Sequence, residues 1–262
     1  MASGRFDGYV VLITGAGRGI GEATARRLAS EGARVLLTDA DGERAEKAAA
    51  ALRAEGLAAE AATCDVGDRA AVEAAVTHAV DRFGRLDVLV NNAFSCHPDP
   101  PLVEDYADGE WSRDLDITLT GAMRCVRAAM PHLAAAGGRG AIVSIGSVNA
   151  EQDFGNHAYS AAKAGLASLT RTLAGQCAPR GVRVNLVAPG TVCTPNWYGR
   201  EAALERAAAH YPLGRVGRPD DIAAAVAFLA SADAVWITGV TLPVDGGILV
   251  GNVGLRGALR GK

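Results

Sequence analysis

Short apolar segments alternate with helix-like segments along most of this sequence, and no other feature constrains the fold as strongly. An apolar run of about six residues is typical of a strand buried on both faces of a parallel sheet. Strand, helix and strand in repeated succession predict right-handed βαβ units, and therefore an α/β fold with a doubly wound parallel sheet. The expected strands are residues 9–14, 33–38, 57–62, 86–91, 140–145 and 182–187, and the expected helices are 20–30, 43–54, 69–83, 111–136 and 158–177.

No internal repeat or low-complexity linker divides the chain, so we expect one domain over residues 1–262. The formal net charge is −3 and basic residues are not clustered, which argues against nucleic acid as a partner. No apolar run reaches the length of about 18 residues that suggests a membrane span, and we expect a soluble, cytoplasmic protein without a membrane partner. The five cysteines are scattered, which predicts reduced thiols and no metal site.

Four glycines follow the first predicted strand, in the stretch TGAGRGIG at residues 14–21, where the first helix begins. Glycine lets a ligand approach the backbone closely, and the free amides of a helix N-terminus attract phosphate. We therefore expect this turn to hold the pyrophosphate of a dinucleotide. The alternative is a tight turn that binds nothing. The residues expected to contact the cofactor here are Gly15, Arg18, Gly19, Ile20 and Gly21.

Asp39 stands at the end of the second predicted strand, where a carboxylate can accept hydrogen bonds from the adenosine ribose. A 2′-phosphate beside it would meet like charge, at a cost of about 1–4 kcal/mol. This favours NAD over NADP, although the Arg18 guanidinium could instead pair with a 2′-phosphate. Asp39 could also simply form a turn or cap the next helix.

Tyr159 and Lys163 are four residues apart in a predicted helix and therefore share one helical face. A phenol with an ordinary pKa of about 10 is a poor acid or base at neutral pH, but an adjacent ammonium favours the phenolate. We expect Lys163 to lower the pKa of Tyr159, and the pair to transfer a proton.

Several motifs accompany this pair in order: the glycine turn, Cys64-Asp65-Val66, Asn91-Asn92-Ala93, Ser147, Pro189-Gly190 and Asp245-Gly246-Gly247. Together they resemble the one-domain branch of the short-chain dehydrogenase/reductase family over nearly the whole chain. The resemblance implies that Tyr159 is the general acid/base, that Lys163 also holds the nicotinamide ribose, and that Ser147 binds the substrate oxygen. It further implies cofactor contacts at Asp65, Val66, Asn92, Val192 and Thr194.

The sequence departs from the family pattern at three positions. Gly146 precedes Ser147 where the family usually has Ser-Ser, which leaves one hydroxyl in the usual place. Phe94 replaces the glycine that usually follows Asn-Asn-Ala, and Thr118 stands where the family has a catalytic asparagine. The family asparagine works largely through its main-chain carbonyl, so we hypothesise that Thr118 keeps this relay at reduced efficiency. These departures leave open the alternative that the protein is a dinucleotide-binding sensor or scaffold that catalyses no reaction. An epimerase or dehydratase on the same scaffold is a further alternative, although such relatives usually carry a larger C-terminal domain.

The substrate is expected to be a small secondary alcohol or its ketone. The segment after Pro189-Gly190 usually forms a lid in this family, and residues 193–214 contain Trp197, Tyr198, His210 and Tyr211. These aromatic residues either cover an apolar substrate or anchor the lid. His97 and His157 could touch substrate or lie in ordinary turns. The helices at 111–136 and 158–177 could pair with other copies in a homodimer or homotetramer, as in the family, and residues 247–262 have no clear secondary structure.

Overall fold

Seven parallel strands form one sheet at the centre of the computed structural model, which describes residues 4–251 and 261. The strand order is β3-β2-β1-β4-β5-β6-β7, so the chain starts in the middle of the sheet and winds outward in both directions. This is the Rossmann-like, doubly wound arrangement expected from the alternation of elements. The strands are β1 (Val10–Thr14), β2 (Arg34–Asp39), β3 (Ala59–Thr63), β4 (Val88–Asn91), β5 (Ala141–Ile145), β6 (Arg183–Pro189) and β7 (Thr241–Val244).

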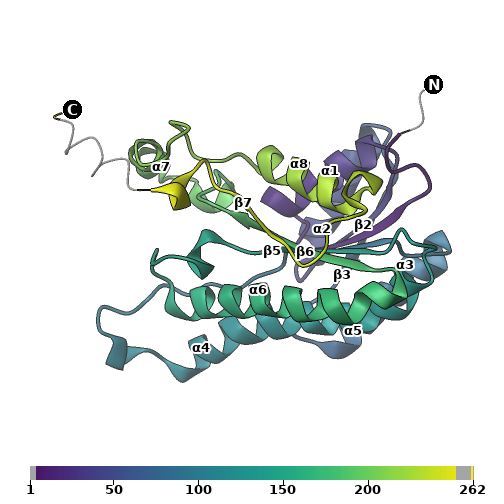
Figure 1. Ribbon diagram of the computed structural model, residues 1–262, viewed down its shortest axis with the longest axis horizontal. Helices are drawn as coiled ribbons and strands as arrows, with labels where there is room; N and C mark the ends of the chain where they lie inside the picture. The colour runs from purple at the N-terminus through teal and green to yellow at the C-terminus, as the bar shows by residue number, and fades with distance from the viewer. Residues whose placement is uncertain (1–3, 252–260, 262) are drawn as a thin grey trace.

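Helices cover both faces of the sheet (Figure 1). Buried side chains of α1 (Gly19–Ser30), α2 (Gly42–Ala54) and α8 (Pro219–Ala230) form the core on one face. The other face packs against α3 (Arg69–Phe83), α5 (Gly121–Ala134) and α6 (His157–Cys177). Two shorter helices complete the set: α4 (Asp108–Leu115) and α7 (Glu201–Ala208).

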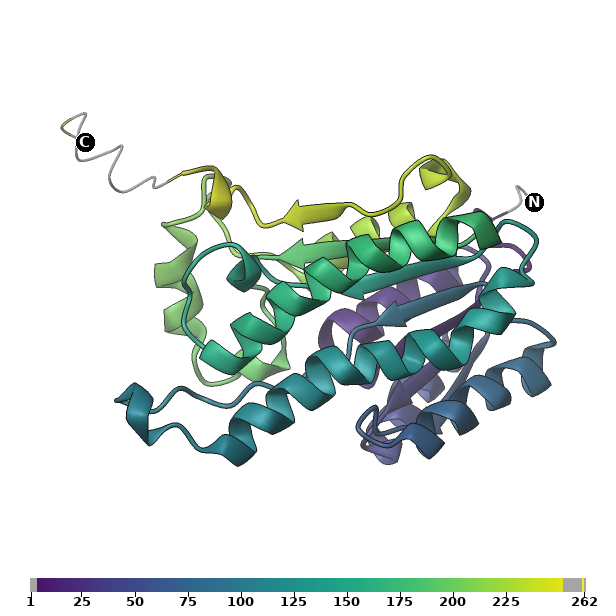
Figure 2. The ribbon, with the colours of Figure 1, turned by 60° about the horizontal axis from the view of Figure 1, so that its bottom comes forward.

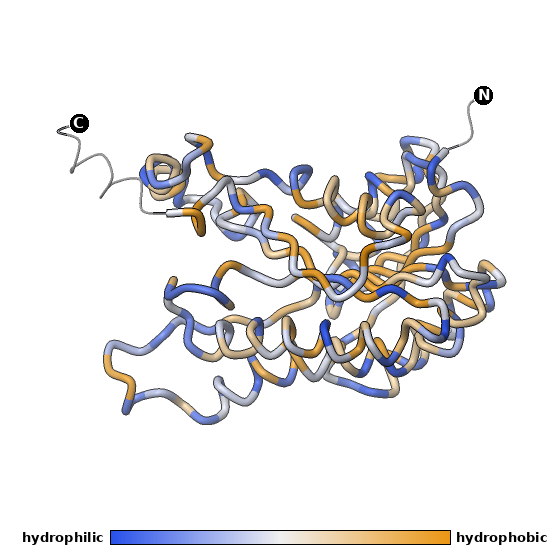
Figure 3. The backbone as a smooth tube through the Cα atoms, in the orientation of Figure 1, coloured by the Kyte–Doolittle hydropathy of each residue, from blue (hydrophilic) through white to orange (hydrophobic). Residues whose placement is uncertain are grey.

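The central strands are apolar on both sides because both sides are covered. All five residues of β1 are buried: Val11 and Ile13 contribute to one core cluster, and Val10 and Leu12 to the other. Figure 3 shows the consequence as a band of hydrophobic backbone through the middle of the molecule. The continuous apolar runs of the sequence therefore did mark buried parallel strands.

All six strands expected from the sequence are present, but the structure adds β7, α7 and α8. The long helix expected at 111–136 is divided into α4, a π-helical turn (η2, Asp116–Thr120) and α5, which Figure 2 shows as one nearly continuous rod beside α6. Of the C-terminal segment expected to lack secondary structure, Ile248–Val250 forms a single 3-10 turn. Residues 252–260 and 262 lie outside the described residues.

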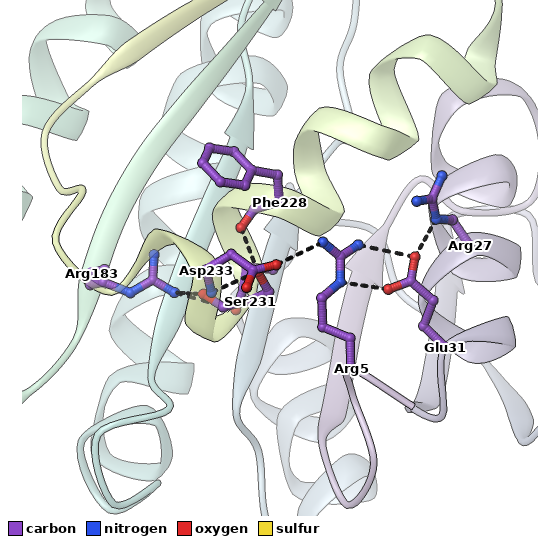
Figure 4. Close-up of polar contacts among 8 residues, drawn as sticks. Arg5, Arg27, Glu31, Arg183, Phe228, Ser231 and Asp233 are labelled. Carbon is purple, nitrogen blue, oxygen red and sulfur yellow. Dashed lines mark hydrogen bonds and ion pairs between the residues drawn. The ribbon is translucent and has the colours of Figure 1, made fainter. Parts of the chain in front are cut away.

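A charged cluster ties the start of the chain to two later elements (Figure 4). Arg5 forms a two-point ion pair with Glu31, which follows α1, with N–O distances of 2.6 and 3.0 Å. Its other terminal nitrogen lies 3.2 Å from Asp233, after α8.

Arg183 of β6 donates to the carbonyl oxygens of Leu229, Ala230 and Ser231 and so caps the end of α8.

Candidate active site

A cleft of about 980 Å³ opens at the carboxyl ends of the strands, beside the point where the strand order reverses between β1 and β4. Ligands of doubly wound sheets bind at this place. Most of the residues expected from the sequence line the cleft, at a site assembled from β1, β2, β5, α6 and the segment after β6. They are Gly15, Arg18, Gly19, Ile20, Asp39, Asn92, Ser147, Tyr159, Lys163, Val192 and Thr194.

The glycine turn forms one wall of the cleft, and its geometry excludes side chains. Gly15 and Gly19 have φ angles of +60° and +62°, which L side chains rarely adopt. A Cβ on Gly21 would lie 2.6 Å from the Gly15 carbonyl oxygen. Asn92 holds the turn from the far side, because its Nδ2 donates to the carbonyl oxygens of Thr14 and Gly15 at 2.9 and 2.8 Å. Gly21 itself is buried behind the turn.

This turn also leads directly into α1, whose first residue is Gly19. Arg18 occupies the N-cap position, and among the described residues its side chain makes no capping hydrogen bond. The amides of the first turn are thus available to an anion at the cleft. A pyrophosphate group fits this cradle of backbone.

Asp39 lies next to the glycine turn, at the end of β2, where it is 5% exposed. Its Oδ2 accepts from the Gly17 amide at 3.1 Å, and its Oδ1 accepts from the Arg44 guanidinium at 2.5 Å. Burial alone would raise the pKa of Asp39, but the hydrogen bonds from Arg44, Asp41 and Gly17 outweigh it and hold the pKa below its ordinary value. Asp39 is therefore a carboxylate at neutral pH.

Arg44 is the main feature of this end of the cleft that sequence reasoning missed. It lines the cleft, and its Nε is buried without a hydrogen-bond partner in the described part of the chain. A buried donor of this kind is costly unless a ligand satisfies it, and ribose hydroxyls could do so. The Asp39–Arg44 pair thus fits the polar end of a dinucleotide. The spacing of five residues, with Arg44 in the first turn of α2, was the available signal.

Asp65, Val66 and Thr118 lie outside the cleft. Asp65 accepts from the Gly67 amide at 2.8 Å, while Val66 is buried, and a Cβ on Gly121 would lie 2.7 Å from its Cγ2. The Thr118 hydroxyl bonds the backbone of Ser95, accepting from its amide at 3.0 Å and donating to its carbonyl oxygen at 3.1 Å. Thr118 thus connects the π-helical turn to the segment after β4, and π-helical turns of this kind are often found at functional sites.

Ser147, Tyr159 and Lys163 come together in the middle of the cleft. The Ser147 hydroxyl donates to Asn149 Oδ1 at 2.9 Å. Lys163 is almost fully buried, and its Nζ donates to the Ile145 carbonyl oxygen at 2.5 Å and lies 5.3 Å from the centre of the Tyr159 ring. The shared helical face inferred from the spacing of four is therefore present in α6.

Burial dominates the ionisation of this pair. It raises the pKa of Tyr159 to about 12, although a hydrogen bond with Ser147 acts in the opposite direction. Burial lowers the pKa of Lys163 to about 7. Desolvation opposes the charged form of both groups, and Lys163 is not among the causes of the Tyr159 pKa shift in this structure.

The other polar and aromatic candidates divide into two groups. Trp197 and Tyr211 of the lid line the cleft, and the Tyr211 hydroxyl accepts from the Thr191 amide at 2.7 Å, so Tyr211 also anchors the lid. Tyr198 is 77% exposed. His97 and His157 lie outside the cleft: His97 Nδ1 is 2.7 Å from Asp114, and His157 Nε2 is 3.7 Å from Asp99. Both histidines therefore have structural partners.

The described residues contain neither a metal-binding cluster nor a membrane-spanning helix. No group of three or more histidine, cysteine or acidic side chains is placed to hold a metal ion. No described helix is both long and apolar enough to cross a membrane.

Comparison with known proteins gave consistent matches over nearly the full chain. A family model described as enoyl-(acyl carrier protein) reductase matches residues 15–249. The chain is 46% identical to cis-4-hydroxycyclohexanecarboxylate dehydrogenase of Sinomonas cyclohexanicum, covering 92% of this chain and 97% of the relative. It is 42% identical to meso-2,3-butanediol dehydrogenase of Serratia marcescens, covering 93% and 95%.

The fold is also similar to a solved structure, the crystal structure of gox2181. The TM-score is 0.89 at 37% sequence identity, and the match covers 94% of this chain and 97% of the other. Together with the glycine cradle and the serine, tyrosine and lysine of the cleft, these matches establish the family and its chemistry. The chain belongs to the short-chain dehydrogenase/reductase family and is an oxidoreductase that transfers hydride between a nicotinamide cofactor and an alcohol or ketone.

Proposed function

We propose that this protein is an NAD-dependent dehydrogenase/reductase of secondary alcohols and ketones, in which Tyr159 is the general acid/base. One observation carries the proposal: Ser147, Tyr159 and Lys163 line the same cleft as the glycine turn. A proton-transferring side chain must lie within reach of both the substrate oxygen and the redox cofactor. In this cleft, a substrate oxygen and the cofactor can both lie within reach of Tyr159.

In the oxidative direction, Tyr159 takes the hydroxyl proton of the substrate while Ser147 hydrogen-bonds the same oxygen. The Ser147 hydroxyl donates to Asn149 in the structure, and it turns from Asn149 to the substrate when it stabilises the oxygen. A bound nicotinamide ring supplies the hydride acceptor. Lys163 would hold the nicotinamide ribose, and in its charged form it favours the Tyr159 phenolate.

The preference for NAD rests on Asp39. Its carboxylate is buried and ionised, so a 2′-phosphate beside it is disfavoured, whereas ribose hydroxyls can donate to it. Arg44 and Arg18 also line this end, and they could offset part of the repulsion of a 2′-phosphate. We give Asp39 the greater weight because it is buried and Arg18 is exposed.

The names of the relatives support a secondary alcohol as substrate but divide on its polarity. One acts on a hydroxylated cyclohexanecarboxylate, while others act on butanediol or threitol. The reacting group proposed here, a secondary hydroxyl or its ketone, is common to these names.

A replacement of Tyr159 by phenylalanine tests the proposal. We expect Tyr159→Phe to lower the turnover of secondary alcohols by about 10²- to 10⁴-fold, the usual contribution of a general acid/base, while cofactor affinity stays close to that of the wild type. Turnover is followed by the absorbance of reduced nicotinamide, and affinity by its fluorescence. A variant that retains wild-type turnover would exclude Tyr159 as the proton carrier.

Cofactor choice is tested separately with Asp39→Asn. Loss of the carboxylate removes the repulsion of the 2′-phosphate, so the ratio of kcat/KM for NAD to that for NADP should fall by about tenfold or more. Arg18→Gln is the control for the competing interpretation. The assignment to NAD is wrong if the wild-type enzyme prefers NADP and the Arg18→Gln variant no longer uses NADP.

We also propose that the chain forms a homodimer or homotetramer through α5 and α6. Met123 of α5 is 39% exposed and lies at a groove of about 300 Å³ beside the two helices. The groove is lined by Met123, Val126, Met130, Pro131, Leu173 and Cys177, together with the polar residues Arg127, Gln176 and Arg180. An exposed apolar side chain beside a groove is compatible with an interaction surface.

A further inference from the structure

Phe94 is an aromatic side chain placed directly beside the catalytic pair. It follows β4, at a position where the resemblance noted above has glycine. Its ring centre lies 5.8 Å from that of Tyr159, with the two planes at 66°, and 5.8 Å from Lys163 Nζ. The ring lines the cleft and is 48% exposed. Phe94 therefore presents about half of its surface to whatever occupies the space next to Tyr159.

Other large apolar side chains line the same cleft. Phe154, on the segment before α6, is 41% exposed, and Trp197 comes from the lid. An exposed aromatic residue loses the benefit of burial unless a ligand covers it, and each square ångström of apolar surface covered is worth about 25 cal/mol. These walls favour a ligand with an apolar body.

Several polar side chains near Tyr159 are already bonded within the protein. Ser147 donates to Asn149, and Asn149 Nδ2 donates to the Gly155 carbonyl oxygen at 3.1 Å and to Ser160 Oγ at 3.2 Å. The Tyr211 hydroxyl accepts from a backbone amide. A site built for several hydroxyl groups needs polar partners that are left unpaired when the ligand is absent. Ser147 is needed for the reacting oxygen, so none of these bonded groups remains for additional hydroxyls; the side-chain amides of Asn156 and Asn196, which also line the cleft, are the exceptions.

The charged side chains that line the cleft also favour a ligand without further hydroxyl groups. Among the residues that the structure describes, Asp39 is the one carboxylate that lines the cleft, and it is bonded to Arg44. Carboxylates are common acceptors for the hydroxyls of sugars and polyols, and Asp39 lies at the end of β2, away from Tyr159. Among the described residues, the other charged side chains that line the cleft are the cations Arg18, Arg44, Lys163 and Arg200, which offer a hydroxyl group no acceptor.

We propose that Phe94 is a specificity-determining residue, and that the substrate carries an apolar ring or branched apolar group next to its reacting carbon rather than further hydroxyls. Phe94 packs against this group and holds the carbinol carbon beside Tyr159. The inference rests on the proposed function, because it concerns the substrate of the same cleft.

The test compares wild type, Phe94→Ala and Phe94→Leu with cyclohexanol and threitol as substrates. Removing the ring should lower kcat/KM for cyclohexanol by about tenfold or more, the usual effect of lost apolar contact in a pocket. Phe94→Leu keeps an apolar wall and should lie between the wild type and Phe94→Ala. Threitol should be the poorer substrate of the wild type and should respond little to either change.

Two outcomes would overturn the inference: threitol preferred by the wild type, or an equal loss for both substrates in Phe94→Ala. An equal loss would mean that the ring only supports the catalytic pair. Binding of cyclohexanone, followed by quenching of tryptophan fluorescence, provides a readout that does not need turnover. Binding that weakens in Phe94→Ala, in a protein that oxidises neither alcohol, would support the inference and contradict the proposed function alone.

Discussion

Burial of Lys163 in the cleft destabilises the protein while its amine is charged, because the residue is only 2% exposed. Burial lowers its pKa to about 7, whereas in the unfolded chain a lysine keeps a pKa of about 10.4. Between these two values the unfolded chain binds one more proton than the folded protein. Stability must therefore increase with pH across this window, and the cost of burying the charge is fully present below pH 7.

This reasoning predicts the behaviour of Lys163→Met. Relative to the variant, the wild type should gain up to about 1.4 kcal/mol of unfolding free energy per pH unit between pH 7 and 10, and the variant should be the more stable protein at pH 6. Turnover should be strongly reduced at every pH. Denaturant unfolding of both proteins at several pH values measures the difference, and parallel curves would show that Lys163 does not titrate in this range.

Single residues also show what a sequence can and cannot predict. Tyr159 and Lys163 were predictable because a spacing of four in a helix fixes their relation. Arg44 was harder to predict, because the spacing of five residues is only a weak signal and the fold decides that its side chain turns back to Asp39. The pKa values of the pair were also inaccessible, because they depend on how much protein surrounds each group.

At the scale of elements, the catalytic helix α6 begins without a local cap. Its N-cap residue, Asn156, has a φ of +57°, and within the described chain its side chain makes no capping hydrogen bond. Asp99 replaces it: this carboxylate accepts from the amides of Asn156 and His157 at 2.5 and 2.8 Å. The first turn of the helix, which contains Tyr159, is thus tied to the segment that follows β4.

We therefore expect Asp99→Ala to destabilise the protein by about 1 kcal/mol, the usual cost of losing a cap. Asp153→Ala is the matched control, because Asp153 accepts only from the Gly155 amide in the same turn and is exposed. Denaturant unfolding compares the two variants, and hydrogen exchange of the first turn of α6 should increase in Asp99→Ala alone. Equal effects of both substitutions would contradict a specific role for Asp99.

There are physical reasons why the sequence did not predict β7 and the π-helical turn. β7 contains Pro243, which cannot donate to a ladder and is tolerated here because the strand lies at the edge of the sheet. The expected helix at 111–136 has a continuous pattern, and its π-helical turn depends on Thr118 bonding the backbone of Ser95, a contact between distant segments. Buried parallel strands, in contrast, are visible in sequence as uninterrupted apolar runs.

At the scale of the whole molecule, the α5–α6 surface should decide the oligomeric state. Met123→Glu places a charge on this surface and should convert an oligomer to a smaller species, because a buried unpaired charge opposes association. Leu213→Glu is the control, since Leu213 is 72% exposed and lies in the lid segment. Sedimentation velocity distinguishes the species. An unchanged sedimentation coefficient for Met123→Glu would exclude α5 from the interface.

The cluster around Arg5 sets an order in which the molecule can be completed during synthesis. Arg5 leaves the ribosome among the first residues, but its partner Asp233 is made more than two hundred residues later. β1 can pair with β2 early, whereas the Arg5–Asp233 ion pair can form only when nearly the entire polypeptide has emerged. A nascent chain halted before that point can form the Arg5–Glu31 pair but lacks the Asp233 contact that joins Arg5 to the segment after α8.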